Sequence, residues 1–407
     1  MNPWVIAWRN VVRNRRRSLL SGGIVVFGFT SFALAGGFMA QSFHGLREST
    51  IHSGLGHLQF ANAGAFDESD DTTLQHGLDN TDALIAALGQ DPAVQVVMPR
   101  IEFFGLATTG AHSIPFMGVG VDPLAEARGS DIPASVHQGH WLTPGQREVV
   151  IGRGLARHLN AKVGDTLTLL ATTPDGVLNA VDANVVGIAD VLVKELSDRY
   201  LATPLPLAQE LLNVSNVASK ISIDLHEPAD VAASGQRLLA KLRPLSPGIS
   251  VKRWDELAAF YAQVKMLYIG IFGFMGVILM VVVFLAAINT TLMTVTERTR
   301  EIGTLRALGA RRGVLVKHFV AEAILLSLVA SGAGALLSIT LSLALNATGI
   351  VLPPPPGSTH GFPIHIQFFP TSYLVATLAM TLTLAMAAYF PARRAARASI
   401  VTSLAHV

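Results

Sequence analysis

Four long apolar runs, separated by more polar segments, dominate the hydrophobic pattern of the chain. They comprise residues 19–39, 266–289, 319–345 and 373–390. A helix needs roughly 20 residues, with a range of about 17–25, to cross a hydrocarbon core about 30 Å thick. The pattern therefore predicts a membrane α-helical protein with four transmembrane helices.

The first run, "SGGIVVFGFTSFALAGGFM", is rich in small residues. Small residues let helices approach closely in lipid, where no hydrophobic force drives helices together. The alternative is a signal peptide, because the run has a basic flank and an "ALA" sequence that resembles a cleavage site. Its apolar part is longer than the roughly 7 to 15 residues of a signal-peptide core, so we expect a retained helix.

Between the first two runs, residues 40–265 alternate between strand-like and helix-like patterns. The order strand, helix, strand occurs in "GHLQFA", "TDALIAALG" and "VQVVMPRIEFFGLAT", and again in "SKISIDL", "EPADVAASGQRLLAKLR" and "GISVKRW". We expect a large α+β domain of two lobes, with one split lobe at about 40–122 and 218–265. The inserted lobe, about 123–217, should be mostly β, and Pro174, Asp175 and Gly176 should form a turn between two of its strands.

The composition supports the membrane assignment. Half of the residues are hydrophobic, 14% are charged, and the mean hydropathy is +0.46. Soluble globular chains are usually more polar. The chain has no cysteine, so the domain at 40–265 must hold together without disulfides.

The distribution of charge predicts the orientation in the membrane. Residues 1–18 carry five arginines and no acid, residues 290–318 carry six basic and two acidic residues, and three arginines follow Phe390. The connection at 346–372 has no lysine or arginine, and residues 40–265 carry 16 basic and 25 acidic residues. The positive-inside rule therefore places both termini and 290–318 in the cytoplasm and the two other segments outside. The sequence pI near 9.0 then reflects topology, and we expect no nucleic-acid partner.

A charged amphipathic stretch precedes the third apolar run. In "TERTREIGTLRALGARRGVLVKHFVAEAILLS", Ile302, Leu305 and Leu308 recur at helical spacing and predict one apolar stripe. Charged residues around the stripe, including Arg298, should face water or a charged partner. Glycine costs about 1 kcal/mol relative to alanine inside a helix, so Gly303 indicates close backbone approach and Gly309 a helix end.

This stretch resembles the FtsX-type permease domain of MacB, LolC and LolE, the type VII or mechanotransmission family of ABC transporters. The closing "PARRAARASIVTSL" is similar to the tail of that family, and "GDTLTLL" followed by "VVGI" looks like its outside β-lobe. The resemblance implies a stand-alone permease without a fused ATPase. The sequence has no G-x-x-x-x-G-K-[ST] phosphate loop, so we expect no enzymatic activity and no cofactor in this chain.

The resemblance also implies partners. We expect a cytoplasmic ABC ATPase dimer that binds ATP and Mg, a second permease copy or a related permease chain, and a possible periplasmic adaptor or carrier. The amphipathic stretch would be the helix that couples to the ATPase, through Glu297, Arg300, Glu301, Ile302, Gly303, Leu305, Arg306, Leu308 and Gly309. The alternative is a helix that merely lies at the lipid interface.

Other candidate residues fall near the membrane boundary. Trp4 and Trp8, ahead of Arg13, Arg15, Arg16 and Arg17, predict an interfacial helix on membrane lipids, and the alternative is an unstructured basic tail. A carboxyl such as Glu322 inside the third run is energetically costly unless it is paired, so we expect a basic partner rather than proton transport.

His137 and His140, in the domain at 40–265, lack further ligands, so we expect no metal site.

Three classes of function fit these observations. The first is a multi-pass permease of the cell inner membrane that uses ATP hydrolysis by its partner to release lipoproteins toward the outer membrane. Within that class, the alternative is MacB-like tripartite efflux of a small hydrophobic or peptide substrate. The second class is an FtsX-like regulator of a periplasmic cell-wall hydrolase, and the third is a membrane receptor or scaffold without an ATPase.

Overall fold

The structure, a computed structural model, describes residues 8–9, 12–13, 15–66, 77–110, 112–191, 194–226, 230–352, 362–363 and 365–397. The chain divides into two compact units. The helical unit comprises Met1–His44, Val264–Val351 and Pro363–Val407, and the sheet unit comprises Gly45–Gln263 and Leu352–Phe362. We describe each unit by itself.

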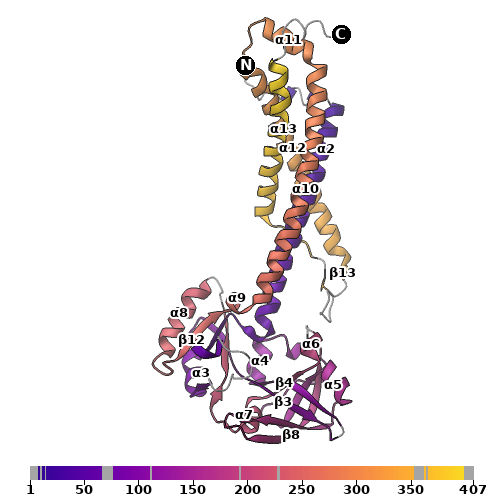
Figure 1. Cartoon of the computed structure of the whole chain (residues 1–407). Helices are drawn as coiled ribbons and strands as arrows, with labels where there is room; N and C mark the ends of the chain where they lie inside the picture. Colours follow the sequence, from indigo (N-terminus) through magenta and orange to yellow (C-terminus); the bar gives the residue numbers. More distant parts are fainter. Residues whose placement is uncertain are drawn as a thin grey trace. The chain divides into compact units, whose positions relative to one another are not determined.

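Four long helices carry the predicted apolar runs (Figure 1): α2 (Arg15–Thr50), α10 (Ala259–Glu297), α12 (Arg312–Thr348) and α13 (Pro370–Arg397). All four are long and apolar enough to cross a membrane. They extend past the predicted spans at both ends. The expected four-helix membrane architecture is confirmed.

The four helices pack around one apolar core in the helical unit. It consists of Val25, Phe29, Ala33, Val283, Ala330, Ala376, Met380 and Leu384. Small residues permit this packing: a Cβ at Gly36 would lie 2.7 Å from the Cβ of Ser372, and the Thr30 hydroxyl donates to the Gly334 carbonyl at 3.1 Å. The predicted role of the small residues in close helix contacts fits this geometry.

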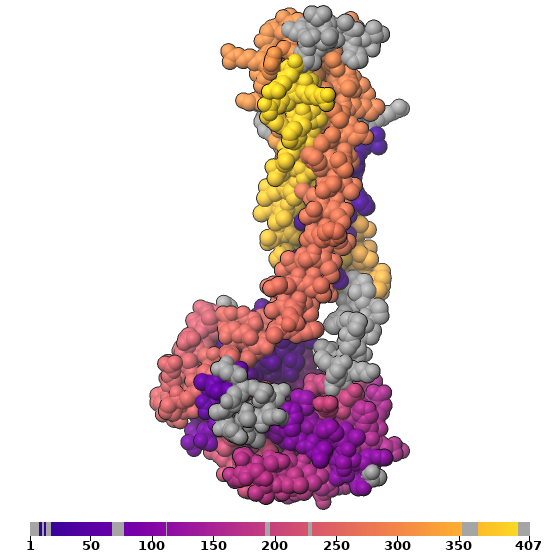
Figure 2. Space-filling view, in the orientation of Figure 1, coloured from indigo at the N-terminus to yellow at the C-terminus, as the bar shows by residue number. Residues whose placement is uncertain are grey.

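Helix α10 is the least buried of the four helices, with only Val283 and Val295 buried along its length. Figure 2 shows its side chains along the outer surface of the helical unit. Large apolar side chains such as Phe274 and Val277 are more than 60% exposed. In a membrane, these side chains face lipid or another protein.

Ten strands of the described residues form one sheet in the sheet unit, in the order β12-β1-β11-β3-β4-β9-β6-β8-β5, with β7 joining β3 and β8. The strands are β1 (Leu58–Asn62), β3 (Val94–Thr108), β4 (Ser113–Val121), β5 (Val136–Gly139), β6 (Glu148–Gly152), β7 (Thr166–Thr172), β8 (Leu178–Ala189), β9 (Tyr200–Pro204), β11 (Lys220–Leu225) and β12 (Ile249–Arg253). Two short strands, β2 (Leu78–Asp79) and β10 (Val217–Ala218), pair with each other.

One part of this sheet closes on itself. Strand β3 pairs with β4, β4 with β9, β9 with β6, β6 with β8, β8 with β7, and β7 with β3. This circuit is a six-stranded barrel, and closure leaves none of its six strands with an unpaired edge in that circuit. Its core includes Phe103, Phe116, Ile151, Leu169 and Val185, together with leucines from helices α5 (Arg153–Leu159) and α7 (Leu205–Leu212).

The rest of the sheet forms the second lobe. Strands β12, β1, β11 and the first half of β3 share a core with α3 (Thr81–Gly89) and α8 (Val231–Leu242). Helix α8 begins directly after Asp230, whose carboxylate accepts from the Ala233 backbone N–H at 3.0 Å. The two-lobed α+β domain is thus as predicted from the sequence.

The boundary between the lobes differs from the expected one. Residues 94–121 were expected in the split α+β lobe, but the second half of β3 and all of β4 belong to the barrel. The reason is that β3 runs without a break through 15 residues and contributes to both cores. The cores therefore divide near Arg100 rather than at residues 122 and 123.

Short helical elements lie between or next to the strands. They are η1 (Ile51–Leu55), η2 (Ala63–Phe66), α4 (Pro123–Gly129), η4 (Pro133–Ser135), α6 (Lys194–Ser197) and α9 (Trp254–Leu257).

Buried charged side chains pack near η1. Arg100 pairs with Glu126, His57 Nδ1 lies 2.9 Å from Asp224 Oδ1, and burial raises the pKa of the nearby Tyr200 hydroxyl. Gly54 has φ of 101°, and a Cβ there would overlap the Arg100 guanidinium.

Candidate functional site

The segment between α10 and α12 forms a separate short helix, α11 (Thr299–Ala307). It ends in a Schellman motif, in which the Gly309 N–H donates to the Arg306 carbonyl and the Ala310 N–H to the Leu305 carbonyl, both at 3.0 Å. Gly309 has φ of 92°, a backbone conformation that residues other than glycine rarely adopt. The predicted helix end at Gly309 is present.

The predicted apolar stripe of α11 divides between two faces. Ile302 is buried, and it packs with Val295 of α10 and Leu315 of α12. Leu305 is 48% exposed and Leu308 is 81% exposed. The spacing alone suggested one common face, but Ile302 serves the protein's own core while the two leucines are available to a partner.

The charged residues of the segment also divide. Glu297, Arg300 and Glu301 are exposed, Arg306 is partly exposed, and Gly303 is buried. Arg298, which we expected to face water or a partner, instead points inward. Its Nη1 lies 3.3 Å from Glu322 Oε2 of α12, and the two side chains are 12% and 20% exposed. The basic partner expected for Glu322 is therefore Arg298.

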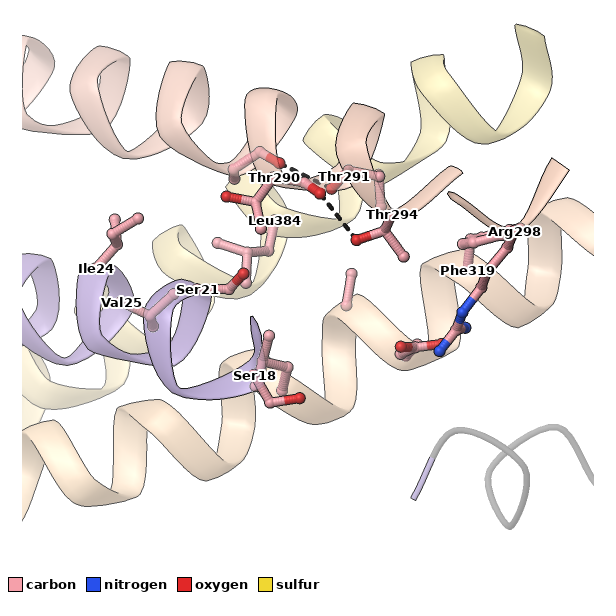
Figure 3. Close-up of a pocket in the computed structure, with 15 residues that line it drawn as sticks. Ser18, Ser21, Ile24, Val25, Thr290, Thr291, Thr294, Arg298, Phe319 and Leu384 are labelled. Carbon is pink, nitrogen blue, oxygen red and sulfur yellow. Dashed lines mark hydrogen bonds and ion pairs between the residues drawn. The ribbon is translucent and has the colours of Figure 1, made fainter. Parts of the chain in front are cut away.

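A cavity of about 70 Å³ lies next to this ion pair (Figure 3). Hydroxyls from two helices line it, and Figure 3 shows them with Arg298 at one end. The hydroxyl residues are Ser18 and Ser21 of α2 and Thr290, Thr291 and Thr294 of α10. The site thus combines two opposite charges with five hydroxyl residues of α2 and α10.

The predicted interfacial residues are described only in part. Trp8 and Arg13 are exposed. Arg15, Arg16 and Arg17 lie in the first turn of α2, and their side chains fall outside the described part of the structure, as does Trp4. The interfacial helix therefore stays a prediction.

The predicted turn in the sheet unit connects β7 to β8. Pro174, Asp175 and Gly176 are all exposed, and the Thr173 N–H donates to the Val177 carbonyl at 2.8 Å. Gly176 has φ of 81°, which explains why glycine occupies this position. The turn lies at one end of the barrel strands and is accessible to solvent.

Beside this turn, the barrel carries apolar side chains on its outer surface. Leu106 pairs with Leu170 and Pro115, Phe104 pairs with Met117, and Thr172 pairs with Leu178. Directly paired residues point to the same side of a sheet, so these side chains share one face. We call it the outer apolar face; it consists of Phe104, Leu106, Pro115, Met117, Leu170, Leu178 and Ala180.

The outer apolar face was not predicted from the sequence. Phe104, Leu106 and Leu178 are 39%, 45% and 65% exposed, although such side chains are usually buried. The available signal was the run "EFFGL", in which adjacent phenylalanines place apolar groups on both sides of β3. Because these side chains gather on one face, we take the face as a candidate interaction surface.

The described residues hold no group of three or more histidine, cysteine, aspartate or glutamate side chains arranged to bind a metal ion. Comparisons with known proteins identify the family of the chain. A MacB-like periplasmic core domain matches residues 18–241, more than half of the chain, and an FtsX-like permease C-terminal domain matches residues 273–400.

The chain belongs to the MacB/FtsX/LolC-LolE family of ABC transporter permeases. It is 25% identical over 335 residues to the lipoprotein-releasing system transmembrane protein LolC of Xylella fastidiosa, covering 77% of this chain and 78% of LolC. It is 26% identical over 333 residues to LolE of Haemophilus influenzae, covering 76% of this chain and 77% of LolE. The macrolide export ATP-binding/permease protein MacB of Escherichia coli is 40% identical over 130 residues, 32% of this chain and 18% of MacB. The family resemblance of the sequence is confirmed.

Proposed function

We propose that this permease couples ATP hydrolysis by a separate cytoplasmic ATPase to movement of its sheet unit, and that the movement releases lipoproteins from the inner membrane. The observation that carries the coupling role is the exposure of Leu305 and Leu308 on a helix whose other face is anchored by Ile302. Buried apolar anchors usually contribute most of the free energy of protein binding. A helix that is held in place by Ile302 and exposes two leucines could bind with them in an apolar groove of an ATPase.

The proposed orientation follows from charge. Helix α11 lies among the basic residues at 290–318, so the positive-inside rule places it in the cytoplasm, where ATP is available. The sheet unit then lies in the periplasm. The partners would be an ATPase dimer that binds ATP and Mg and a second copy of this permease or a related chain.

Lipoprotein release is favoured over efflux by how far the similarity extends. LolC and LolE, which are named as parts of a lipoprotein-releasing system, match more than three quarters of this chain. The MacB match is more identical but covers only 130 residues. The outer apolar face suits a periplasmic carrier of acylated cargo, because such a carrier must expose apolar surface where the cargo transfers. Efflux remains the second candidate, on the strength of the 40% identity to MacB.

A reconstituted system tests the proposal. The permease is purified with the ATPase that it retains and is placed in vesicles that contain a fluorescent triacylated peptide. We expect ATP to move the peptide from the vesicles to a soluble acceptor protein, whereas an otherwise identical vesicle without ATP keeps its peptide. If ATP is hydrolysed and the peptide stays, while a fluorescent macrolide is transported across the same vesicles, the protein is an efflux permease.

A further inference from the structure

We infer that Arg298 is a positioning residue for α11: its ion pair with Glu322, hydrated by the adjoining cavity, sets how α11 moves relative to α10 and α12. The inference rests on the proposed coupling function, and it adds the residue pair that carries the movement into the membrane helices. All groups concerned lie in the helical unit.

The bend between α10 and α11 is confined to Arg298. Helix α10 ends at Glu297, α11 begins at Thr299, and Arg298 has φ of −94° and ψ of 9°. The backbone stays hydrogen-bonded on both sides, because the Arg298 N–H donates to the Thr294 carbonyl at 3.2 Å and its own carbonyl accepts from Ile302 at 2.9 Å. A change of helix direction at this point therefore needs few broken bonds, and Arg298 is the residue that turns.

The side chain of the same residue reaches the neighbouring helix. Arg298 Nη1 lies 3.3 Å from Glu322 Oε2, so the bend and α12 are joined by one charge pair. Both side chains are largely removed from solvent. A charge without a partner is costly in such a place. Turning of α11 must therefore either carry α12 along or separate the two charges.

The cavity beside the ion pair has room for water, which allows the two charges to separate. A water molecule needs about 10–15 Å³ of such space, and the cavity has about 70 Å³. Thr290, Thr291 and Thr294 donate their hydroxyl protons to carbonyls one turn earlier, at 2.9, 2.8 and 2.8 Å, which leaves lone pairs that accept from water. Arg298 Nη2 has no hydrogen-bond partner among the described residues, so it can donate to water in the cavity.

These observations combine into one device. Without water beside the pair, separating the two charges would be costly, because each would lose its partner at a site with little access to solvent. With water and hydroxyls beside them, the charges can part and rejoin, so α11 can leave its paired position relative to α12 and return to it. Ile302 keeps α11 attached in either case, through its contacts with Val295 and Leu315.

The test separates docking of the ATPase from transmission of its movement. Glu322→Gln removes one charge with little change of size, Arg298→Gln removes the other and shortens the side chain, and the exchanged pair Arg298→Glu with Glu322→Arg restores a pair. Lys317→Gln removes an exposed charge from the same part of α12 and is the matched control. We expect each single variant to retain the ATPase as the parent does but to release at least about fivefold less triacylated peptide per ATP hydrolysed.

A distance measurement gives a readout that does not depend on any partner. Because the chain has no cysteine, spin labels can be placed on cysteines introduced at Thr304 of α11 and Val314 of α12, both exposed. We expect a broader distance distribution in Glu322→Gln and Arg298→Gln than in the parent and in Lys317→Gln, and a narrow one in the exchanged pair.

The outcomes distinguish this inference from the proposed function. A parent chain that retains no ATPase contradicts the proposed function, while the distance measurement still tests the inference. If both single variants keep the parent's distance distribution and its release per ATP, the inference is wrong. If the single variants lose the narrow distance distribution and the release per ATP, and the exchanged pair restores neither of these, the two residues act separately. That result also overturns the inference.

Discussion

The guanidinium of Arg47 lies over the indole ring of Trp254, 5.7 Å from the ring centroid. The Trp254 ring also packs edge-on against the Tyr261 ring, with 4.9 Å between the ring centroids. The backbone N–H of Trp254 donates to the His57 carbonyl at 3.2 Å. Arg47 belongs to the end of α2, and Trp254 begins α9, just before α10. The two chain segments that lead into the sheet unit are thus held to each other.

We expect Trp254→Leu to destabilise the sheet unit by about 1–2 kcal/mol, because it removes a cation–π contact and an aromatic pair. Hydrogen exchange should rise at residues 47–57 and 253–258 in this variant. Trp254→Phe keeps an aromatic face toward Arg47 and should fall between the parent and Trp254→Leu. Equal exchange in the parent and Trp254→Leu would show that the contact does not hold the two segments.

Two glycines of α2 should respond differently to the same substitution. A Cβ at Gly37 would lie 2.6 Å from the Gln367 carbonyl oxygen, whereas nothing lies within 4 Å of a Cβ at Gly23. Gly37→Ala should therefore cost about 1–3 kcal/mol through overpacking. Gly23→Ala should be neutral or stabilise the helix by up to about 1 kcal/mol. Thermal unfolding in detergent, followed by tryptophan fluorescence, compares them; equal midpoints would contradict the packing described for α2.

The exposed leucines of α11 should be required for retention of the ATPase. Leu308→Asp and Leu305→Asp each place a carboxylate in the proposed contact, and we expect at least about 2 kcal/mol of lost binding free energy, or roughly 30-fold weaker binding. Membrane insertion should persist because both side chains are exposed in the permease. Pull-down at matched expression measures retention.

The matched control is Leu245→Asp, a leucine of the sheet unit with 44% exposure. It should hold the ATPase as the parent does. If Leu308→Asp and Leu305→Asp do so as well, α11 is an interfacial anchor, and the docking surface must lie on other residues.

The outer apolar face and its turn should be needed for release but not for assembly. Leu106→Ser combined with Leu178→Ser removes exposed apolar groups, so stability should change by no more than about 0.5 kcal/mol per site. Release of triacylated peptide to a soluble acceptor should fall, while ATPase retention stays at the parental level. Replacing Pro174, Asp175 and Gly176 should have the same effect, and unchanged release in both variants would make the face and turn purely structural.

Cysteines at Asp175 and Arg311 test the proposed orientation. Both positions are exposed, and the native chain contributes no competing thiol. An impermeant maleimide added to intact spheroplasts should label the Asp175 variant and reach the Arg311 variant only after permeabilisation. Labelling of both from the same side would rule out the predicted arrangement of the spans.

The membrane helices could be predicted from the sequence because an apolar run of some 20 residues has few alternative structures. Closure of the barrel could not, because the pairings β4 to β9 and β6 to β9 join residues far apart in the chain. Helical spacing showed that Ile302, Leu305 and Leu308 lie close together around α11, but not which of them turns inward. That depends on Val295 and Leu315, which belong to other helices.

Glu322 shows the same limit for charged residues. Its place in an apolar run indicated that it needs a basic partner, since an unpaired carboxylate is expensive there. Several arginines were available at residues 298–312, and only the bend between α10 and α11 selects Arg298. The need for a pair is therefore a property of the sequence, and the choice of partner is a property of the fold.

The continuity of β3 has a mechanical consequence for the sheet unit. Its first half is bonded to β11 and its second half to β4 and β7, so a force applied to the barrel enters the other lobe as shear along the backbone. Hydrogen bonds loaded in shear share the force, whereas side-chain contacts between two separate lobes would yield one by one. Mutations that loosen either core should leave this route for force intact, provided that β3 stays one strand.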